Sequence, residues 1–381
     1  MLSEVVRLRA EIERYSRQIV LPAFGVEAQA KLCGAAVLVV GAGGLGSPAA
    51  LYLAAAGVGR LGIVDCDAVE RSNLHRQVIH SEAAVGGHKA LSAAAACRAV
   101  NSSIQVEAHC CRLAPGNALE LVRGYDAVVD ASDNAFTRYL LSDACAVARR
   151  PLMSGAALGT DGHLTVYCLG DDGPCHRCLF PEAPRPEACG RCSDAGVLGP
   201  VPGIIGTLQA MEAVKVVTGV GRPLSRRLLM LDALQGRMHT VKLRAKMVGC
   251  VACSAAATIT SASLASYDYA AFTGAQPNDA APPQLHLLRD AERLSPAALR
   301  ERLEDGEEAV VVDVRPRNQF DIAHIPGSLS CPYDVGRPDQ RGNDSQRVVA
   351  LLRENGIGCA MDMVGGLQAW AALADPSFPA Y

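Results

Sequence analysis

The stretch from residue 35 to residue 65 constrains the fold more than any other part of the sequence. Residues 36–40 form an apolar run that predicts a buried parallel strand. Ser47 can cap a helix, and Pro48 suits the first turn of that helix. Between the strand and the helix lie three glycines in G-x-G-x-x-G spacing, at Gly41, Gly43 and Gly46. This order of elements predicts a βαβ unit in a doubly wound, Rossmann-like, mostly parallel α/β sheet.

The chemistry of such a unit is anion binding beside a ribose. Glycines let the backbone approach a phosphate, and the free N–H groups at the helix start bind it. A second predicted strand, 61–64, ends in Asp65, whose carboxylate can accept hydrogen bonds from ribose hydroxyls. A strand-to-helix turn without a ligand is the alternative. A membrane helix is excluded, because Pro48 and seven glycines interrupt the uncharged run 32–59.

Bulk composition narrows the class of protein further. The chain has 381 residues, enough for two domains. Fifteen cysteines without a visible signal peptide indicate a reducing compartment, where clustered thiols serve metal binding or catalysis. The net charge of −3 argues neither for nor against a nucleic-acid partner. We expect a cytoplasmic protein that contacts neither membranes nor nucleic acid directly.

Three C-x2-C pairs raise the question of a metal site. Two such pairs together make a tetrahedral zinc site, but three pairs leave the choice open. The first and second pairs would form a local ribbon, which proximity in sequence favours. If the first and third pairs bound the metal instead, they would hold a distant segment on the domain. A thiol of the second pair would then be free to act as a nucleophile. The pairs are Cys175/Cys178, Cys189/Cys192 and Cys250/Cys253.

Polar residues gather where predicted strands end. Residues 72–77 are polar and follow the second strand. Lys89 is a solitary lysine in an arginine-rich region, and a compact ammonium suits a phosphate. Asp133 and Asn134 follow a predicted strand at 125–130. An acid at this edge could hold Mg²⁺ on a triphosphate, or it could cap the helix that follows.

The organisation of the chain changes after residue 253. We expect a domain over 1–253, a linker over 254–290, where the sequence turns small and polar, and a second α/β domain over 291–381. In the second domain, Ser295 and Pro296 predict a helix start. Residues 309–314 predict a buried strand.

The motifs together resemble the MoeB/ThiF/ubiquitin-activating family, and the likeness covers residues 12–253 nearly without gaps. Besides the glycine loop, the matching motifs are RYSRQIVL (14–21), GVGRLG (57–62), DCD (65–67), SNLHRQ (72–77), GHK (87–89) and SDN (132–134). The C-terminal part resembles a rhodanese domain through VDVR (312–315), HIPG (324–327), GNDSQ (342–346) and GGLQAW (365–370).

The resemblance implies an enzyme that uses ATP and Mg²⁺. Asp65 would hold the ribose, Asp133 the Mg²⁺, and Arg17 would reach into the partner's site across a homodimer. Zn²⁺ is implied on Cys175, Cys178, Cys250 and Cys253, which overrules the local ribbon. Cys192 is implied as the thiol that meets the activated carbonyl. The implied nucleotide-binding residues are Gly41, Gly43, Gly44, Asp65, Ser72, Asn73, Leu74, His75, Arg76, Lys89, Asp133 and Asn134.

The implied reaction is adenylation of the C-terminal Gly-Gly carboxylate of ubiquitin-like sulfur-carrier proteins. By resemblance, these carriers serve molybdopterin synthesis and thiolation of the tRNA wobble uridine, with a cysteine desulfurase as sulfur donor. An NAD-dependent oxidoreductase is the rival, since G-x-G-x-x-G with an acid also suits NAD. Asn73, Arg76 and Lys89 argue against this rival, because they suit a triphosphate better than the pyrophosphate diester of NAD. A non-catalytic scaffold that only binds the carrier is the third hypothesis.

The rhodanese-like part departs from its family at one point. In the family, two residues separate the persulfide cysteine from Gly-Asn-Asp-Ser-Gln, and that cysteine position is Asp339 here. The apolar strand before it is also missing, since residues 337–341 are polar and contain a proline. A carboxylate cannot carry a sulfane sulfur. We therefore expect an incomplete rhodanese-like domain without sulfur transfer, arising from real loss or from an error in the gene model.

Overall fold

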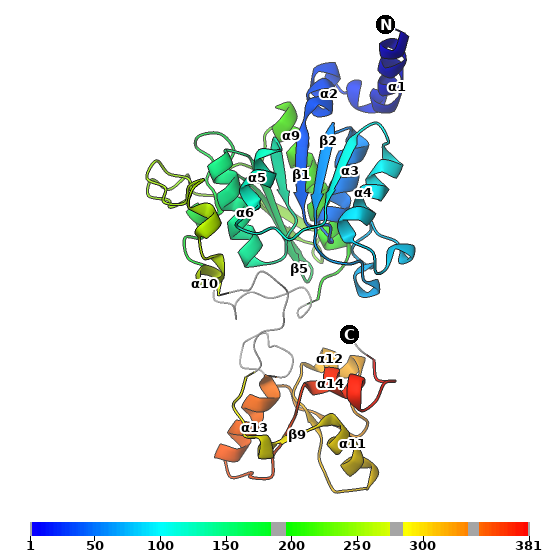
Figure 1. Cartoon of the computed structure of the whole chain (residues 1–381), viewed down its shortest axis with the longest axis vertical. Coiled ribbons are helices and arrows are strands. Elements are labelled where there is room, and N and C mark those ends of the chain that lie inside the picture. The colour runs from blue at the N-terminus through cyan, green and yellow to red at the C-terminus, as the bar shows by residue number, and fades with distance from the viewer. Residues whose placement is uncertain (1, 184–195, 275–284, 334–342, 380–381) are drawn as a thin grey trace. The chain divides into compact units, whose positions relative to one another are not determined.

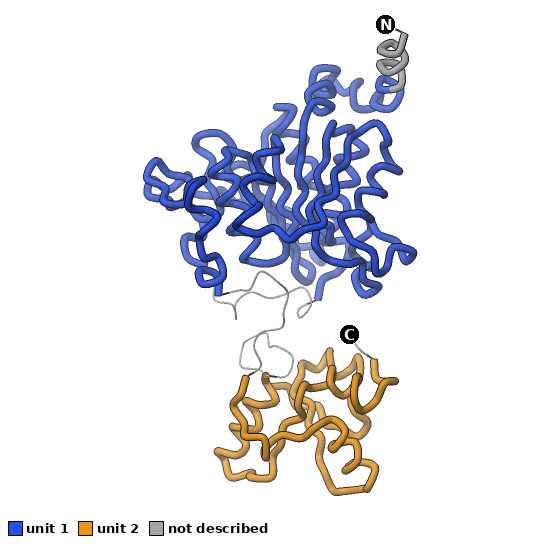
Figure 2. The backbone as a smooth tube through the Cα atoms, in the orientation of Figure 1, with its two compact units in different colours: residues 1–277 blue, residues 278–381 orange. Residues whose placement is uncertain are grey.

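The computed structural model divides into two compact units, residues 1–277 and 278–381 (Figure 2). It describes residues 2–183, 196–274, 285–333 and 343–379, with side chains from residue 11 onward. Each unit is a fold of its own.

An eight-stranded sheet forms the centre of the first unit, in the order β3-β2-β1-β4-β5-β6-β7-β8 (Figure 1). The parallel strands are β1 (Ala36–Val40), β2 (Arg60–Val64), β3 (Gln105–His109), β4 (Ala127–Asp130) and β5 (Leu152–Leu158). The antiparallel extension is β6 (Asp161–Tyr167), β7 (Arg227–Asp232) and β8 (Arg237–Lys242). The predicted mostly parallel α/β sheet is confirmed.

Helices cover both faces of the sheet because the central strands are apolar on both faces. In β1, Val37 and Val39 point into one core, and Leu38 and Val40 into the other. The first core is completed by α3 (Gly46–Ala56), α4 (Lys89–Val100) and α9 (Pro200–Thr218). The second is completed by α5 (Ala118–Arg123), α6 (Ala135–Ala148) and α10 (Tyr269–Thr273). The N-terminal helices are α1 (Leu2–Ile19) and α2 (Gly25–Gly34).

Two elements of the first unit differ from the sequence analysis. The central strand β5 was not predicted, because its sequence LMSGAAL lacks β-branched residues and only its place between β4 and β6 makes it a strand. Part of the expected linker is also folded. Leu264 and Tyr269 are each 1% exposed, and α10 packs on α6. Burial of these two side chains holds a polar-looking segment on the first unit.

The second unit is small and has short strands. As predicted, Ser295 caps a helix there, because its hydroxyl accepts a hydrogen bond from the Ala298 N–H. Its helices are α11 (Pro296–Glu304), α12 (Arg317–Ile322), α13 (Asp344–Glu354) and α14 (Gly366–Leu373). Its strands are β9 (Arg293–Leu294), β10 (Val312–Asp313), β11 (Leu329–Ser330) and β12 (Asp362–Met363).

The predicted buried strand at 309–314 is wrong. The strand β10 spans two residues, and Val310 and Val312 are 75% and 46% exposed. Within the described residues, β10 pairs only with β11. The polar segment 337–341, which replaces an expected strand, lies outside the described residues.

Candidate active site

The glycine loop lies at the carboxyl end of β1 and is shaped by close backbone contacts. Gly41 has a φ of +100°, and a side chain there would put Cβ 2.6 Å from the Ala131 carbonyl oxygen. A Cβ on Gly46 would lie 1.8 Å from the Gly41 oxygen. Only glycine fits at either position, so the first and last glycines of the motif are steric requirements of this turn.

Asp65, at the end of β2, is tied directly to this loop. Its Oδ2 accepts a hydrogen bond of 2.8 Å from the Ala42 N–H, and its Oδ1 accepts one of 2.9 Å from the Asp67 N–H. Burial raises the pKa of Asp65, although both hydrogen bonds favour the charged form. The carboxylate is therefore held beside the glycine loop, where the sequence analysis expected a ribose partner.

The polar segment after β2 folds back onto the loop as a compact turn. The guanidinium of Arg76 donates to Asn73 Oδ1 at 2.7 Å and contacts His75 Nε2 at 2.7 Å. A Cβ on Gly44 would lie 3.6 Å from Arg76 Cγ. The structure thus brings Arg76, one of the predicted nucleotide-binding residues, to the glycine loop. Ser72 and Asn73 belong to the 3₁₀ turn 71–73, and Leu74 ends this turn.

Lys89 begins α4, and its side chain is almost completely buried. Its ammonium lies 3.0 Å from Asp67 Oδ2. Since Asp67 also donates its backbone N–H to Asp65, the predicted cation and the predicted ribose acid belong to one hydrogen-bonded group.

His80 is a buried residue of this region that sequence reasoning missed. Its Nε2 lies 2.9 Å from the carbonyl oxygen of Ala42, and its Nδ1 lies 2.9 Å from Ser92 Oγ. We assign the proton to Nε2, since a carbonyl can only accept. Burial lowers the pKa of His80, which keeps the ring neutral. The ring joins the glycine loop to α4. In the sequence, the only sign of this role is the position of His80, three residues after Gln77 at the end of the polar segment.

Asp133 and Asn134, the third and fourth residues after β4, divide the roles that the sequence left open. Asn134 caps α6, because its side-chain oxygen accepts a hydrogen bond of 2.8 Å from the Thr137 N–H. Asp133 is exposed at the same sheet edge. Behind them, the buried Asp130 accepts hydrogen bonds from the hydroxyls of Ser132 and Ser154. Helix capping therefore accounts for Asn134 and leaves Asp133 available for another role.

Arg17 is not brought to the glycine loop of its own chain. Its helix α1 is anchored by the buried Tyr15, whose hydroxyl accepts a hydrogen bond of 2.9 Å from Asn101. The same ring packs against Gly57, which precedes β2. The anchor therefore lies at the amino ends of the strands, opposite to the carboxyl end that carries the glycine loop (Figure 1). Arg17 itself is exposed there.

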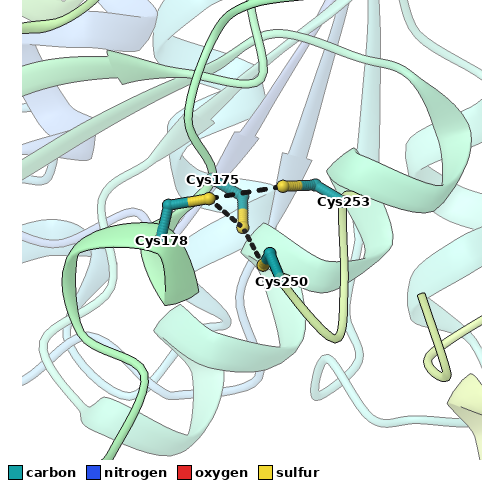
Figure 3. Close-up of side chains that lie close together, drawn as sticks. All are labelled: Cys175, Cys178, Cys250 and Cys253. Atoms are coloured by element: carbon teal, nitrogen blue, oxygen red, sulfur yellow. Dashed lines mark hydrogen bonds between the residues drawn. The ribbon is translucent and has the colours of Figure 1, made fainter. Parts of the chain in front are cut away.

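Four sulfur atoms meet in a cluster formed by Cys175, Cys178, Cys250 and Cys253, all within 4.8 Å of one another (Figure 3). Cys175 Sγ lies 3.5 Å from Cys250 Sγ, and Cys178 Sγ lies 3.4 Å from Cys253 Sγ. The local-ribbon alternative is thus wrong for the first pair. Four convergent thiols fit a tetrahedral metal without an open position, which is the geometry of a structural site.

Several predicted positions lie outside the described residues: Cys189, Cys192, Asp339 and Gly342. Within the part of the chain that is described, no helix is both long enough and apolar enough to span a bilayer.

The parallel sheet, the glycine loop with its adjoining acid, and the cysteine cluster define a nucleotide-binding α/β protein with a metal-binding element. The model of the ThiF family matches residues 15–254, and that of the rhodanese-like domain matches residues 295–347. The chain therefore belongs to the ThiF family, and it carries a rhodanese-like domain after the ThiF part.

Full-length relatives agree with this assignment. The chain is 51% identical over 391 residues to adenylyltransferase and sulfurtransferase MOCS3-1 of Zea mays, covering 97% of this chain and 83% of the relative. It is 47% identical over 401 residues to MOCS3 of Arabidopsis thaliana, covering 97% and 86%. It is 44% identical over 407 residues to MOCS3 of Bos taurus, covering 98% and 88%.

A solved structure supports the fold alone. The crystal structure of Escherichia coli MccB with MccA-N7isoASN matches with a TM-score of 0.57 at 23% identity, over 64% of this chain and 74% of that chain.

Proposed function

We infer that this protein is an ATP-dependent adenylyltransferase that activates the C-terminal Gly-Gly carboxylate of ubiquitin-like sulfur-carrier proteins. The activated carriers serve thiocarboxylate formation in molybdopterin synthesis and in thiolation of the tRNA wobble uridine. One observation carries the inference: the glycine loop, Asp65, Arg76 and Lys89 lie together at the carboxyl ends of β1 and β2. The names of the full-length relatives agree with it.

The chemistry explains the residue types. A carboxylate and a triphosphate repel each other, so their approach needs several cations. The carrier's carboxylate attacks the α-phosphate, which forms an acyl-adenylate and releases pyrophosphate. In this proposal Asn73, Arg76 and Lys89 bind the phosphates. The exposed Asp133 would hold Mg²⁺, which supplies further positive charge.

Pyrophosphate exchange tests the proposal against its rivals. Exchange that depends on a carrier ending in Gly-Gly supports it. NAD binding without any exchange would instead favour an oxidoreductase, whose cofactor carries a pyrophosphate diester with less charge than ATP has. Carrier binding with neither activity would favour a non-catalytic scaffold.

Cys192 is proposed as the thiol that receives the activated carbonyl. A Cys192→Ala variant that keeps pyrophosphate exchange but loses thiocarboxylate output supports this role. Unchanged output would show that adenylation proceeds without a covalent intermediate.

Zn²⁺ is the metal proposed for the four-cysteine cluster. Thiolate sulfur is a soft ligand, and a closed tetrahedral set of four suits zinc in a structural role. We also propose a homodimer in which Arg17 acts on the partner's site, a cysteine desulfurase as sulfur donor, and a cytoplasmic location, which suits a chain with fifteen cysteines.

The rhodanese-like part, proposed as residues 291–381, is expected not to transfer sulfur. The relatives' names include a sulfurtransferase, but that step needs a thiolate where this chain has Asp339. Thiosulfate and cyanide provide the assay, and turnover above background would refute the expectation. A transcript that encodes a cysteine before Gly342 would restore the second activity.

A further inference from the structure

Asp67 and Lys89 form an ion pair at the edge of the candidate nucleotide site. Lys89 Nζ lies 3.0 Å from Asp67 Oδ2, and the two side chains are 8% and 48% exposed. The backbones are joined as well, since the Lys89 N–H donates to the Asp67 carbonyl at 2.9 Å. A bridge between Ala68 and His88 closes the same contact. The lysine is thus fixed at both its backbone and its ammonium.

This ion pair continues into the glycine loop. The Asp67 N–H donates to Asp65 Oδ1, and Asp65 Oδ2 accepts from the Ala42 N–H. One chain of hydrogen bonds therefore connects the loop, the ribose acid and the buried ammonium. Partial burial opposes ionisation of Asp67, but the Lys89 ammonium, together with a hydrogen bond from Cys66 and the charge of Arg112, lowers the pKa of Asp67, so its carboxylate is charged at neutral pH.

We propose that Asp67 is a positioning residue for adenylation, which fixes the Lys89 ammonium where the triphosphate must bind. The proposal rests on the proposed function, in which Lys89 contacts the phosphates. A lysine has four rotatable side-chain bonds and three N–H donors. One donor is taken by Asp67, which leaves the others directed and available for phosphate oxygens. An ammonium that is already in place needs no reorganisation as charge develops in the transition state.

The proposal predicts a split between kcat and KM for Asp67→Asn. Loss of the fixed geometry affects the transition state, so kcat for pyrophosphate exchange falls about tenfold, or about 1.4 kcal/mol. Loss of a negative charge beside the triphosphate favours ATP binding, so KM for ATP does not rise. Affinity for AMP, which lacks the outer phosphates, stays unchanged.

Three further variants sharpen the test. Asp67→Glu keeps the charge and is expected to recover most of kcat. Glu82→Gln removes an exposed carboxylate that pairs with Arg71 at 3.9 Å, and it is the control for net charge, with kcat unchanged. In a Lys89→Met background, Asp67→Asn has no further effect on single-turnover adenylation, because Asp67 acts through Lys89.

The outcomes separate the two levels of inference. If wild-type protein shows no exchange, the proposed function fails and this proposal fails with it. If wild type is active but Asp67→Asn keeps its kcat, Asp67 does not position Lys89. A variant that loses AMP and ATP affinity equally, or that lowers kcat equally with and without Lys89, assigns Asp67 a structural role and also overturns the proposal.

Discussion

The guanidinium of Arg177 and the carboxylate of Asp143 form an ion pair in the interior of the first unit, with Nη2 2.9 Å from Oδ2. The side chains are 2% and 0% exposed. Arg177 lies between Cys175 and Cys178 of the four-cysteine cluster in the sequence, and Asp143 lies on α6. The hydroxyl of Tyr269, on α10, donates to the same carboxylate at 2.9 Å. The pair therefore joins the cysteine cluster to two helices.

Asp143→Asn is expected to destabilise the first unit by about 3–5 kcal/mol, because it leaves the Arg177 charge buried without its counter-ion. Urea denaturation of the full chain measures the effect. Asp172→Asn is the matched control, since Asp172 pairs with Arg226 at 3.3 Å on the surface. That control should cost less than about 1 kcal/mol. Equal effects of the two substitutions would contradict the prediction.

Substitutions at Asp133 and Asn134 should have separate effects, one on activity and the other on stability. Asn134→Ala removes the cap of α6 and should cost about 1 kcal/mol of folding free energy. Asp133→Asn should leave stability unchanged and abolish Mg²⁺-dependent pyrophosphate exchange, because Asp133 is exposed and proposed to hold the metal. Denaturation and exchange assays on both variants give the comparison. An active Asp133→Asn enzyme would remove this residue from the site.

Arg17 should act only from the partner subunit, because its helix is anchored at the end of the sheet opposite to the glycine loop. Arg17→Ala and Lys89→Met are each expected to keep only a small residual activity alone. After subunit exchange, mixed dimers contain one intact site, and about a quarter of wild-type activity should return. No recovery in a preparation that contains mixed dimers, as mass spectrometry would show, contradicts action across the dimer.

The four-cysteine cluster should hold one tightly bound metal ion per chain. Elemental analysis is expected to find zinc, and Cys250→Ser should lower both the metal content and the thermal midpoint. Acid should release the metal, because its ligands must be thiolates. Cys110→Ser is the control, since Cys110 is exposed and lies outside the cluster. Full stability of the metal-free protein would argue against a structural role.

His80 should make stability depend on pH. Its pKa is lowered from an ordinary value of 6.5 by burial, so below that pH the unfolded chain binds a proton that the folded chain does not. The stability that the neutral His80 contributes is therefore fully present above about pH 6.5 and is lost as the pH falls below that value. Denaturation of His80→Gln at several pH values should show a weaker decline than wild type shows. His239→Gln, at an exposed position on β8, should not alter the decline.

The elements that sequence predicted best are those whose residues interact locally. The glycine spacing, the apolar run of β1 and the start of α11 after Ser295 are set by neighbours in the chain. The unpredicted β5 and the folded segment around Tyr269 depend on packing against distant residues, and that packing leaves no local pattern. Val312 shows the opposite kind of error. An apolar pattern predicted a buried strand there, but such a pattern does not ensure a partner strand, and Val312 is exposed.

For the candidate site, the sequence by itself determined which residue types and spacings are present, because a phosphate-binding turn needs glycines and a four-thiolate metal site needs cysteines. Only the tertiary structure decided which of them meet. It joined Cys175 to Cys250 across 75 positions, linked Asp65 to Lys89 through Asp67, and placed Arg17 at the far end of the sheet. These contacts depend on how strands and helices stack, and such stacking is a property of the whole fold rather than of any segment.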